Sequence, residues 1–275
     1  MTSLKVLEQQ LQLLDAAERS LDAEIGRILP VLEEYPIRSY KPLGLPAELG
    51  GDPRAAKGVA YAFHCSPAIH RLNIGQNRSG RTYADSAELV MHLLGEYPEW
   101  YPRECRIWDG ETRHRPLKAR VLAPTFNKGI MDVVWPAIES LLPKSMRVTP
   151  KRNSSGDLTA ASFPNGAEIS FMAYVQGPKK AAGWHGHFAM FDEPPEDREI
   201  YIETVRGLLD WNGRDVLGFT NVGPGVPWVD KMFMRLHRAR AEEKQLFGVN
   251  SMSWPGPLSS KRAYFNFPLE ANPNI

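Results

Sequence analysis

The pattern of apolar and polar positions divides the chain into an N-terminal helical stretch and a longer region of alternating elements. In residues 3–34, apolar side chains recur at alternating steps of three and four, which predicts a helix with one apolar seam. Glu18 interrupts the seam once, and Pro30 is expected to kink or end the helix. We expect this seam either to pack on the parent domain, the more ordinary outcome, or to pair with another chain. Its members are Leu4, Leu7, Leu11, Leu14, Leu21, Ile25, Ile28 and Leu32.

Beyond this helix the pattern predicts a mainly parallel sheet. Residues 36–58 contain closely spaced prolines and glycines, which is typical of a connecting segment. Short apolar strands then alternate with helices, the order found in sheets that helices cover on both faces. After about residue 250 we find no further periodic element. The expected strands are 71–74, 119–123, 168–174, 187–191 and 215–220, and the expected helices are 81–94, 130–142 and 201–209.

Composition excludes some classes of protein. Of the 275 residues 43% are hydrophobic and 24% are charged, as in ordinary globular proteins. No apolar run approaches the roughly 18 to 20 residues of a membrane span, and the polar first residues do not form a signal peptide. Two cysteines, Cys65 and Cys105, indicate a reduced protein without a disulfide framework. The net charge of +1 leaves two basic clusters, which are either phosphate-binding surfaces or solvated faces. They consist of Arg113, Arg115, Lys118 and Arg120, and of Lys144, Arg147, Lys151 and Arg152.

The segment between the 71–74 strand and the 81–94 helix fits a phosphate-binding loop. Its glycines allow backbone N–H groups to turn toward phosphates, and the helix N-terminus adds its positive dipole end. The Thr82 hydroxyl is expected to bind the Mg²⁺ that accompanies ATP. The alternative is an ordinary glycine turn. The segment reads Gly75-Gln76-Asn77-Arg78-Ser79-Gly80-Arg81-Thr82, against the pattern G-x-x-x-x-G-K-[ST].

Arg81 departs from this pattern, because lysine is expected at its position. The exchange is not conservative, since lysine carries a compact point charge and arginine a wide planar fork. Arg78 supplies a second cation that can share the neutralisation of phosphate charge. We therefore expect nucleotide binding to persist, and the rate of hydrolysis is the property that Arg81 puts in question.

Two further segments carry candidate chemistry. The apolar strand 187–191 ends in Asp192 and Glu193. Asp192 is expected to hold Mg²⁺ through water and Glu193 to polarise the attacking water as general base. The strand 215–220 ends in Thr220 and Asn221, which are expected to sense the γ-phosphate and couple its presence to other parts of the motor. The alternatives are a strand that ends in a charged turn and a strand followed by a plain loop.

Together these segments resemble a family, the ATPase domain of phage terminase large subunits, over roughly residues 60–230. The loop's G-x-N-R-S-G form and the D-E-P-P ending of the acidic strand are closer to terminases than to metabolic kinases or transporters. The residues that carry the resemblance are Phe63-His64, Gly75-Gln76-Asn77-Arg78-Ser79-Gly80, Phe191-Asp192-Glu193-Pro194-Pro195, Gly218-Phe219-Thr220-Asn221 and Trp228.

The resemblance implies a fold and further site residues. The fold is expected to be α/β, a P-loop NTPase of the additional-strand class, with the phosphate-loop strand beside the Asp192 strand. Phe63 and His64 are expected near the adenine, and Arg78 on phosphate within the subunit. An arginine from a neighbouring subunit completes such sites, and Arg206 and Arg214 are candidates by position.

The resemblance also implies a cellular role. ATP and Mg²⁺ are the expected cofactors, and hydrolysis is expected to move double-stranded DNA into a procapsid. The expected partners are a portal protein, a small terminase subunit and further copies of the chain in a ring, without a membrane, in the cytoplasm of the infected host cell. We expect a helical extension and linker at 1–58, the ATPase domain at 59–250 and, at 251–275, a tail or the start of a linker to a nuclease domain. No nuclease activity is expected of this chain.

Two other functions compete with this one. A helicase shares the P-loop and the Asp–Glu pair, but it normally carries a second motor domain, for which the chain has no length. A nucleotide-binding scaffold is the second alternative, in which Arg81 weakens hydrolysis and the seam at 4–32 mediates assembly with the portal or the small subunit.

Overall fold

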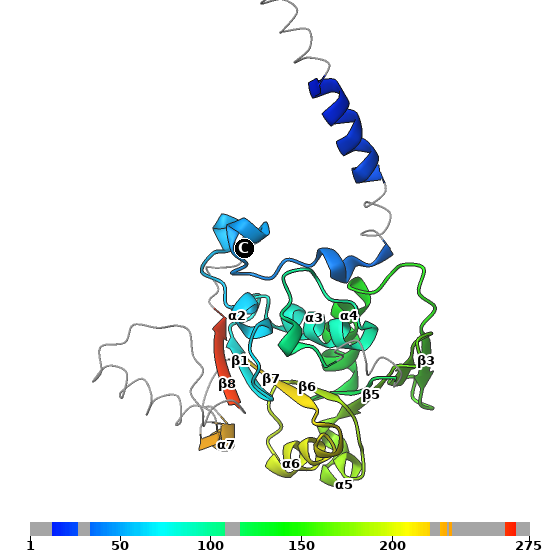
Figure 1. Ribbon diagram of the computed structural model, residues 1–275. Helices are drawn as coiled ribbons and strands as arrows, with labels where there is room; N and C mark the ends of the chain where they lie inside the picture. The colour runs from blue at the N-terminus through cyan, green and yellow to red at the C-terminus, as the bar shows by residue number, and fades with distance from the viewer. Residues whose placement is uncertain are drawn as a thin grey trace, which may run out of the picture.

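The computed structural model describes residues 13–26, 34–107, 116–220, 226–229, 231–232 and 262–267. An eight-stranded sheet runs through this part of the chain in the order β3-β4-β5-β2-β6-β7-β1-β8 (Figure 1). The pairings from β5 to β8 are all parallel, and β3 and β4 add an antiparallel edge. The strands are β1 (His70–Gly75), β2 (Lys118–Ala123), β3 (Thr149–Arg152), β4 (Leu158–Ser162), β5 (Glu168–Ala173), β6 (Phe188–Asp192), β7 (Arg214–Thr220) and β8 (Arg262–Phe267).

Helices cover both faces of the sheet, as the alternation of elements predicts. Helices α2, α3 and α4 lie on one face and α5 and α6 on the other (Figure 1). The α-helices are α2 (Ala60–His64), α3 (Arg81–Leu94), α4 (Trp135–Ser140), α5 (Pro178–Ala181), α6 (Arg198–Arg206) and α7 (Pro227–Val229). A π-helix, η5 (Phe126–Val134), precedes α4. Short 3-10 helices are η1 (Pro36–Ser39), η2 (Ala47–Leu49), η3 (Pro53–Ala55), η4 (Arg103–Cys105), η6 (Tyr174–Gln176) and η7 (Leu209–Trp211).

The predicted elements are found, and the helix after the phosphate loop spans 81–94 as expected. The expected helix at 130–142 is instead a π-helix followed by a short α-helix, and the helix expected at 201–209 begins earlier, at Arg198. That earlier start is fixed by a cap, because the Asp197 carboxylate accepts the Glu199 N–H at 2.9 Å.

Three strands were not predicted. β3 is exposed along its whole length, so it carries no apolar pattern that marks a strand. β4 lies beside it in an antiparallel hairpin. The expectation of no periodic element after residue 250 is wrong, because β8 pairs in parallel with β1 and extends the sheet. A short edge strand depends on its neighbour more than on its own sequence.

The order of the central strands corrects one further expectation. The phosphate-loop strand β1 does not lie beside the Asp192 strand β6, because β7 lies between them and pairs with both. This intervening strand is the additional strand that gives the class its name. Since all three are parallel, their carboxyl ends meet at one edge of the sheet, where Gly75 is opposite Thr220 and Asp192 is opposite Gly218.

The N-terminal helix is present over residues 13–26 and does not pack on the domain. All of these residues are exposed, and the helix stands out from the body (Figure 1). The expected packing of the seam against the parent domain is therefore not what the described part shows. Residues Leu4, Leu7, Leu11, Ile28, Pro30 and Leu32 lie outside the described part of the chain. Among the helices that are described, none has the length and apolar character to cross a membrane.

Candidate nucleotide-binding site

The phosphate loop connects β1 to α3 by a tight turn at the carboxyl edge of the sheet. The Ser79 N–H donates to the Gln76 carbonyl at 3.1 Å, and Arg78 and Gly80 both have positive φ, at 69° and 83°. Gln76, Asn77 and Arg78 are exposed at the tip of the turn. The Ser79 side chain is buried, and its hydroxyl has no hydrogen-bond partner among the described residues. An orphaned buried hydroxyl beside a helix N-terminus fits a loop that is shaped to surround a ligand.

Arg81 is buried and joins the three segments that the sequence singled out. Its Nη2 lies 3.1 Å from Glu193 Oε1, 3.5 Å from Asp192 Oδ1 and 3.3 Å from Thr220 Oγ1. The cation in the lysine position thus points at both carboxylates of the acidic pair. The loop, the end of β6 and the end of β7 therefore meet at Arg81.

Gly218 in β7 makes room for this arrangement. A Cβ at this position would lie 1.9 Å from Arg81 Nη1 and 2.9 Å from Asp85 Oδ2. Both atoms therefore lie directly against the glycine backbone. A larger residue at 218 would have to displace the guanidinium. The buried position of the Arg81 side chain therefore depends on β7, a strand far from it in sequence.

Glu193 is fixed from several sides. Its backbone is in the left-handed region with φ 71°, which is rare for a residue with a side chain. The Thr220 N–H donates to both carboxylate oxygens, at 2.9 and 3.1 Å, and the Thr220 hydroxyl donates to one of them. The Tyr174 hydroxyl donates to the Glu193 carbonyl. Glu193 is thus tied to Thr220, the residue that is expected to sense the γ-phosphate.

Asp192 and Thr82 form an oxygen-rich pair joined by a side-chain hydrogen bond. Asp192 is buried, and this burial raises the pKa of its carboxyl, although nearby Arg81 and a hydrogen bond from Thr82 act to lower it. Carboxylate and hydroxyl oxygens are ligands that Mg²⁺ prefers, and it keeps several waters besides. The two residues expected to hold the metal therefore lie side by side and are of the correct chemical type.

Three residues of the site were not predicted, namely Asn73, Asp85 and Tyr174, and Gly218 was named within the segment 218–221 without a role of its own. Burial raises the pKa of Asp85 to about 7, against the opposing effect of Arg81. Asn73 donates its side-chain amide to Asp85. One signal was available, because Asp85 follows Arg81 by four residues and so shares its face of the helix. Tyr174 and Gly218 have no such local signal.

Phe63 and His64 lie in the core of the domain. Both are fully buried. His64 Nδ1 lies 2.6 Å from Glu88 Oε2, and its Nε2 lies 3.0 Å from the Tyr40 hydroxyl. Both nitrogens of the His64 imidazole are thus occupied by residues of the same chain. The expected place of Phe63 and His64 near the adenine stays a prediction.

The two candidate trans arginines lie away from the phosphate loop. Arg214 begins β7, at the end opposite Thr220, and donates to the carbonyls of Cys105 at 2.9 Å and Glu104 at 3.2 Å. Arg206 is exposed on α6 and pairs with Glu203 at 2.5 Å. Their action on a neighbouring subunit stays a prediction, and Asn221 lies outside the described residues.

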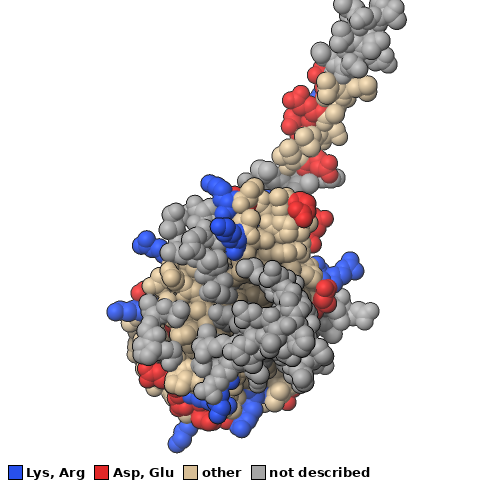
Figure 2. Space-filling view, turned by 90° about the vertical axis from the view of Figure 1, so that its left-hand side faces the viewer, with Lys and Arg blue, Asp and Glu red and all other residues tan. Residues whose placement is uncertain are grey.

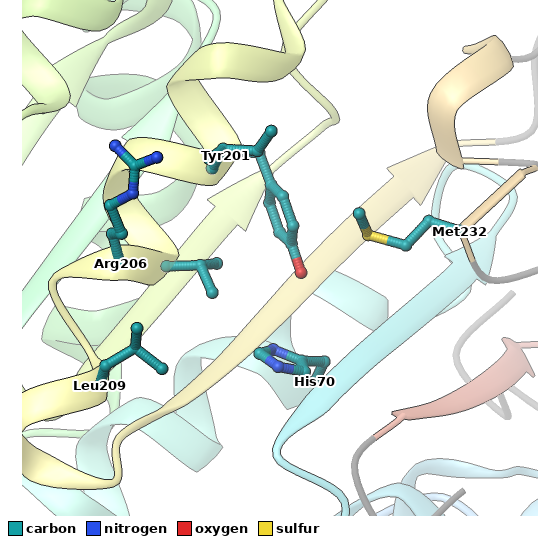
Figure 3. A pocket seen from close by; sticks show the side chains of 7 residues that line it. His70, Tyr201, Arg206, Leu209 and Met232 are labelled. Atoms are coloured by element: carbon teal, nitrogen blue, oxygen red, sulfur yellow. The ribbon is translucent and has the colours of Figure 1, made fainter. Parts of the chain in front are cut away.

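A hollow lies beside Arg206, at the amino-terminal ends of β1 and β7 (Figure 3). His70 hydrogen-bonds Asp215 there, and the Tyr201 hydroxyl donates to the same carboxylate at 3.1 Å. This hollow is at the opposite edge of the sheet from the loop, so it is not part of the nucleotide site. Its lining includes Ile202, Val205, Leu209 and Met232.

The basic clusters are divided by the fold. Arg120 is buried and donates to the Ala181 carbonyl at 3.0 Å, so it has a structural role. Arg113 and Arg115 lie outside the described residues. The cluster of Lys144, Arg147, Lys151 and Arg152 is exposed before and along β3.

Comparison with known proteins gives structural relatives only. No family model and no curated protein matches the chain. The large terminase of a thermophilic bacteriophage, in complex with ADP, matches with a TM-score of 0.50 and 12% identity, over 79% of this chain and 47% of that chain. The large terminase ATPase domain of Thermus phage P74-26 matches with a TM-score of 0.48 and 15% identity, over 80% and 82%. The HK97 large terminase gives 0.48 and 10%, over 82% and 43%.

At such low identity a structural match shows the fold and nothing beyond it. The resemblance predicted from the motifs is therefore confirmed at the level of fold: the chain has the additional-strand P-loop architecture of the phage large terminases that it resembles.

Proposed function

We propose that this chain is the ATP-hydrolysing motor domain of a viral DNA-packaging terminase. The observation that carries the proposal is the convergence of Arg81, the Asp192–Glu193 pair and Thr220 at the end of a phosphate-loop strand. The fold shared with the ADP-bound large terminase supports a nucleotide as the ligand. Binding of double-stranded DNA, a portal protein and a small terminase subunit, ring assembly and location in the host cytoplasm belong to the same proposal.

The residues divide the work as follows. Backbone N–H groups of 75–82 surround the phosphates, with Arg78 and Arg81 neutralising their charge. Thr82 and Asp192 hold Mg²⁺, which supplies positive charge against the phosphate oxygens. Glu193 orients and deprotonates the attacking water, because it directly follows the metal-binding residue Asp192 and its side chain is 29% exposed to solvent. Thr220, the last residue of β7, senses the γ-phosphate and couples its presence to other parts of the motor.

Glu193 is held by Arg81 and Thr220 in this structure. These contacts keep the catalytic base engaged until a nucleotide binds. A carboxylate that accepts from a guanidinium, an amide and a hydroxyl has few lone pairs left for water. Phosphate competes for Arg81 because it is also a bidentate acceptor. Once Arg81 turns to phosphate, Glu193 keeps its link to Thr220 and becomes available to water.

The same contact supports a second candidate, a nucleotide-binding scaffold with weak hydrolysis. If Arg81 stays in contact with Asp192 and Glu193 when nucleotide binds, Glu193 cannot act as the base toward water. In that case the chain binds ATP and turns it over slowly.

The test is ATP binding and turnover with Mg²⁺, with and without double-stranded DNA. Glu193→Gln is expected to lower turnover by at least about a hundredfold, because it removes the base and keeps the shape. The matched control is Glu196→Gln, an exposed glutamate three residues away, which is expected to leave turnover unchanged. Equal turnover of Glu193→Gln and the parent would refute the motor proposal.

Arg81→Lys separates the two candidates. Under the motor proposal the parent is active, and lysine changes turnover by less than about tenfold. Under the scaffold proposal the parent binds ATP but is nearly inert, and lysine raises turnover. A parent that does not bind nucleotide at all contradicts both.

A further inference from the structure

The protruding helix over residues 13–26 carries an apolar seam that nothing in the described chain covers. Its members Leu14, Leu21 and Ile25 are 68%, 59% and 45% exposed. With Glu18 they are spaced by steps of four, three and four. The same alternation continues in the sequence on both sides of the described helix, from Leu4 to Leu32. A repeat of 3.5 residues, here interrupted at Glu18 and followed by Pro30 before Leu32, is the pattern of a two-stranded coiled coil rather than of a helix that lies on a globular core.

The residues that flank the seam are acidic. Asp15 follows Leu14 and Asp22 follows Leu21, which are heptad e positions, and Glu24 precedes Ile25 at a g position. Glu18 occupies a seam position itself. Within 13–26 the basic residue is Arg19, which lies off the seam and donates to the Asp15 carbonyl at 3.1 Å. Figure 2 shows that charge on the protruding helix is predominantly acidic.

This charge pattern disfavours a second copy of the same helix. In a parallel pair the two Glu18 side chains face each other within the seam, where charge is partly desolvated. In an antiparallel pair e positions meet e positions, so Asp15 and Asp22 of the two chains repel. The acidic flanks also oppose a surface of anionic lipid.

We propose that this helix binds a partner helix of different sequence, in which a leucine- or isoleucine-rich seam is flanked by lysine and arginine. Apolar seams bury against each other, and the basic flanks pair with Asp15 and Asp22 across the interface. A lysine opposite Glu18 satisfies the charge in the seam and fixes the register. The interaction is independent of the nucleotide site.

The direct test uses two synthetic four-heptad peptides with Leu at d and Ile at a, apart from one central a position that is Lys in both to face Glu18. One has Lys at every e and g position and the other has Glu at those positions, so neither peptide pairs well with itself. The whole protein is expected to bind the Lys peptide at least about tenfold more tightly at low salt. The difference is expected to shrink as salt is raised. Fluorescence anisotropy of labelled peptide measures both affinities.

Two variants test the seam against simple stickiness. Leu14→Ser with Leu21→Ser is expected to weaken binding of the Lys peptide by at least about a hundredfold, because two buried leucines are lost. The matched control is Leu13→Ser, since Leu13 is 67% exposed but lies one residue off the seam. It changes helix propensity in the same way and is expected to leave affinity within about threefold. Circular dichroism checks that each variant folds.

Charge reversal tests the choice of partner. Asp15→Lys with Asp22→Lys is expected to reduce the preference for the Lys peptide or to reverse it. Equal binding of both peptides by the parent overturns the proposal. It is also overturned if Leu13→Ser weakens binding of the Lys peptide as much as the double serine variant does. Self-association through the seam, seen by sedimentation equilibrium and abolished by the double serine variant, also overturns it in favour of a second copy.

Discussion

Two buried arginines of this protein each lie against a carboxylate, and their surroundings differ. Arg71 Nη1 lies 2.6 Å from Glu88 Oε1, and both side chains are fully enclosed. Glu88 also contacts His64, His92 and the Tyr101 hydroxyl at 2.6, 3.2 and 2.9 Å. Arg81, in contrast, lies against Glu193, which is 29% exposed at the edge of the sheet.

The two ion pairs differ in solvent exposure: the Arg71–Glu88 pair is fully buried, and the Arg81–Glu193 pair is partly exposed. Burial acts to raise the pKa of Glu88, but Arg71, His64 and His92 hold it well below its usual value, so the charge is kept and satisfied inside the domain. Arg81 lies against the partly exposed Glu193, and under the proposed function phosphate competes for its guanidinium. The Arg71 cluster is thus enclosed within the fold, whereas under the proposed function Arg81 exchanges the acidic pair for phosphate.

The largest expected effect comes from the enclosed cluster. Glu88→Gln leaves Arg71 buried without a counter-charge, and we expect a loss of about 3–5 kcal/mol in the free energy of unfolding. Urea denaturation measures this loss. Glu193→Gln is the matched substitution in the open cluster, with an expected change of less than about 1 kcal/mol. Equal losses in the two variants would contradict the distinction between the clusters.

A smaller effect is expected where Arg81 meets β7. Gly218→Ala places a Cβ 1.9 Å from Arg81 Nη1, and the guanidinium has to move. Since the clashing atom is the end of a flexible side chain, we expect only about 1–2 kcal/mol of lost stability. Turnover is expected to change by about tenfold or more, because Arg81 shifts relative to Glu193. Unchanged turnover would show that the position of Arg81 does not control the site.

The two clusters are also expected to respond to pH in opposite directions. Burial raises the pKa of Asp85 to about 7, so its carboxyl stays protonated in the folded state while it ionises in the unfolded chain. Stability is therefore lost as pH rises from about 4 to about 7. Burial lowers the pKa of His92 to about 4, so the unfolded chain takes up the proton first as pH falls. That contribution is lost as pH falls from about 6.5 to about 4.

Variants separate these opposing contributions. Relative to Asp85→Asn, the parent is expected to lose stability as pH rises through this window. Relative to His92→Gln, the parent is expected to gain stability as pH rises. Each slope is at most about 1.4 kcal/mol per pH unit. Urea denaturation at several pH values measures both, and slopes of the same sign would rule out the assignment.

The smallest expected effect concerns the backbone of Glu193. Tyr174→Phe removes the hydroxyl that donates to the Glu193 carbonyl, and we expect a loss of about 1 kcal/mol in stability. Because the left-handed conformation of Glu193 depends on such contacts, turnover is expected to fall by a few fold. Tyr83→Phe is a control on an exposed tyrosine of α3, with little expected change in either property.

The sequence by itself determined the elements that depend on contiguous residues. The glycine loop, the start of α3 and the acidic end of β6 lie next to apolar runs whose period predicts a strand or a helix. The expected roles of Thr82, Asp192 and Glu193 then follow from their residue types and from their positions next to those elements. This local information was sufficient for the class of fold and for most of the candidate site.

Only the tertiary structure decided which segments meet. The pairing of β7 with β1, the contact of Arg81 with Glu193 and the need for glycine at 218 join residues more than a hundred positions apart in sequence. Strand order, burial and β8 pairing depend on non-local contacts, which no local period encodes. The exposure of the N-terminal seam is of the same kind, because an apolar stripe in the sequence looks the same whether the domain covers it or leaves it for a partner.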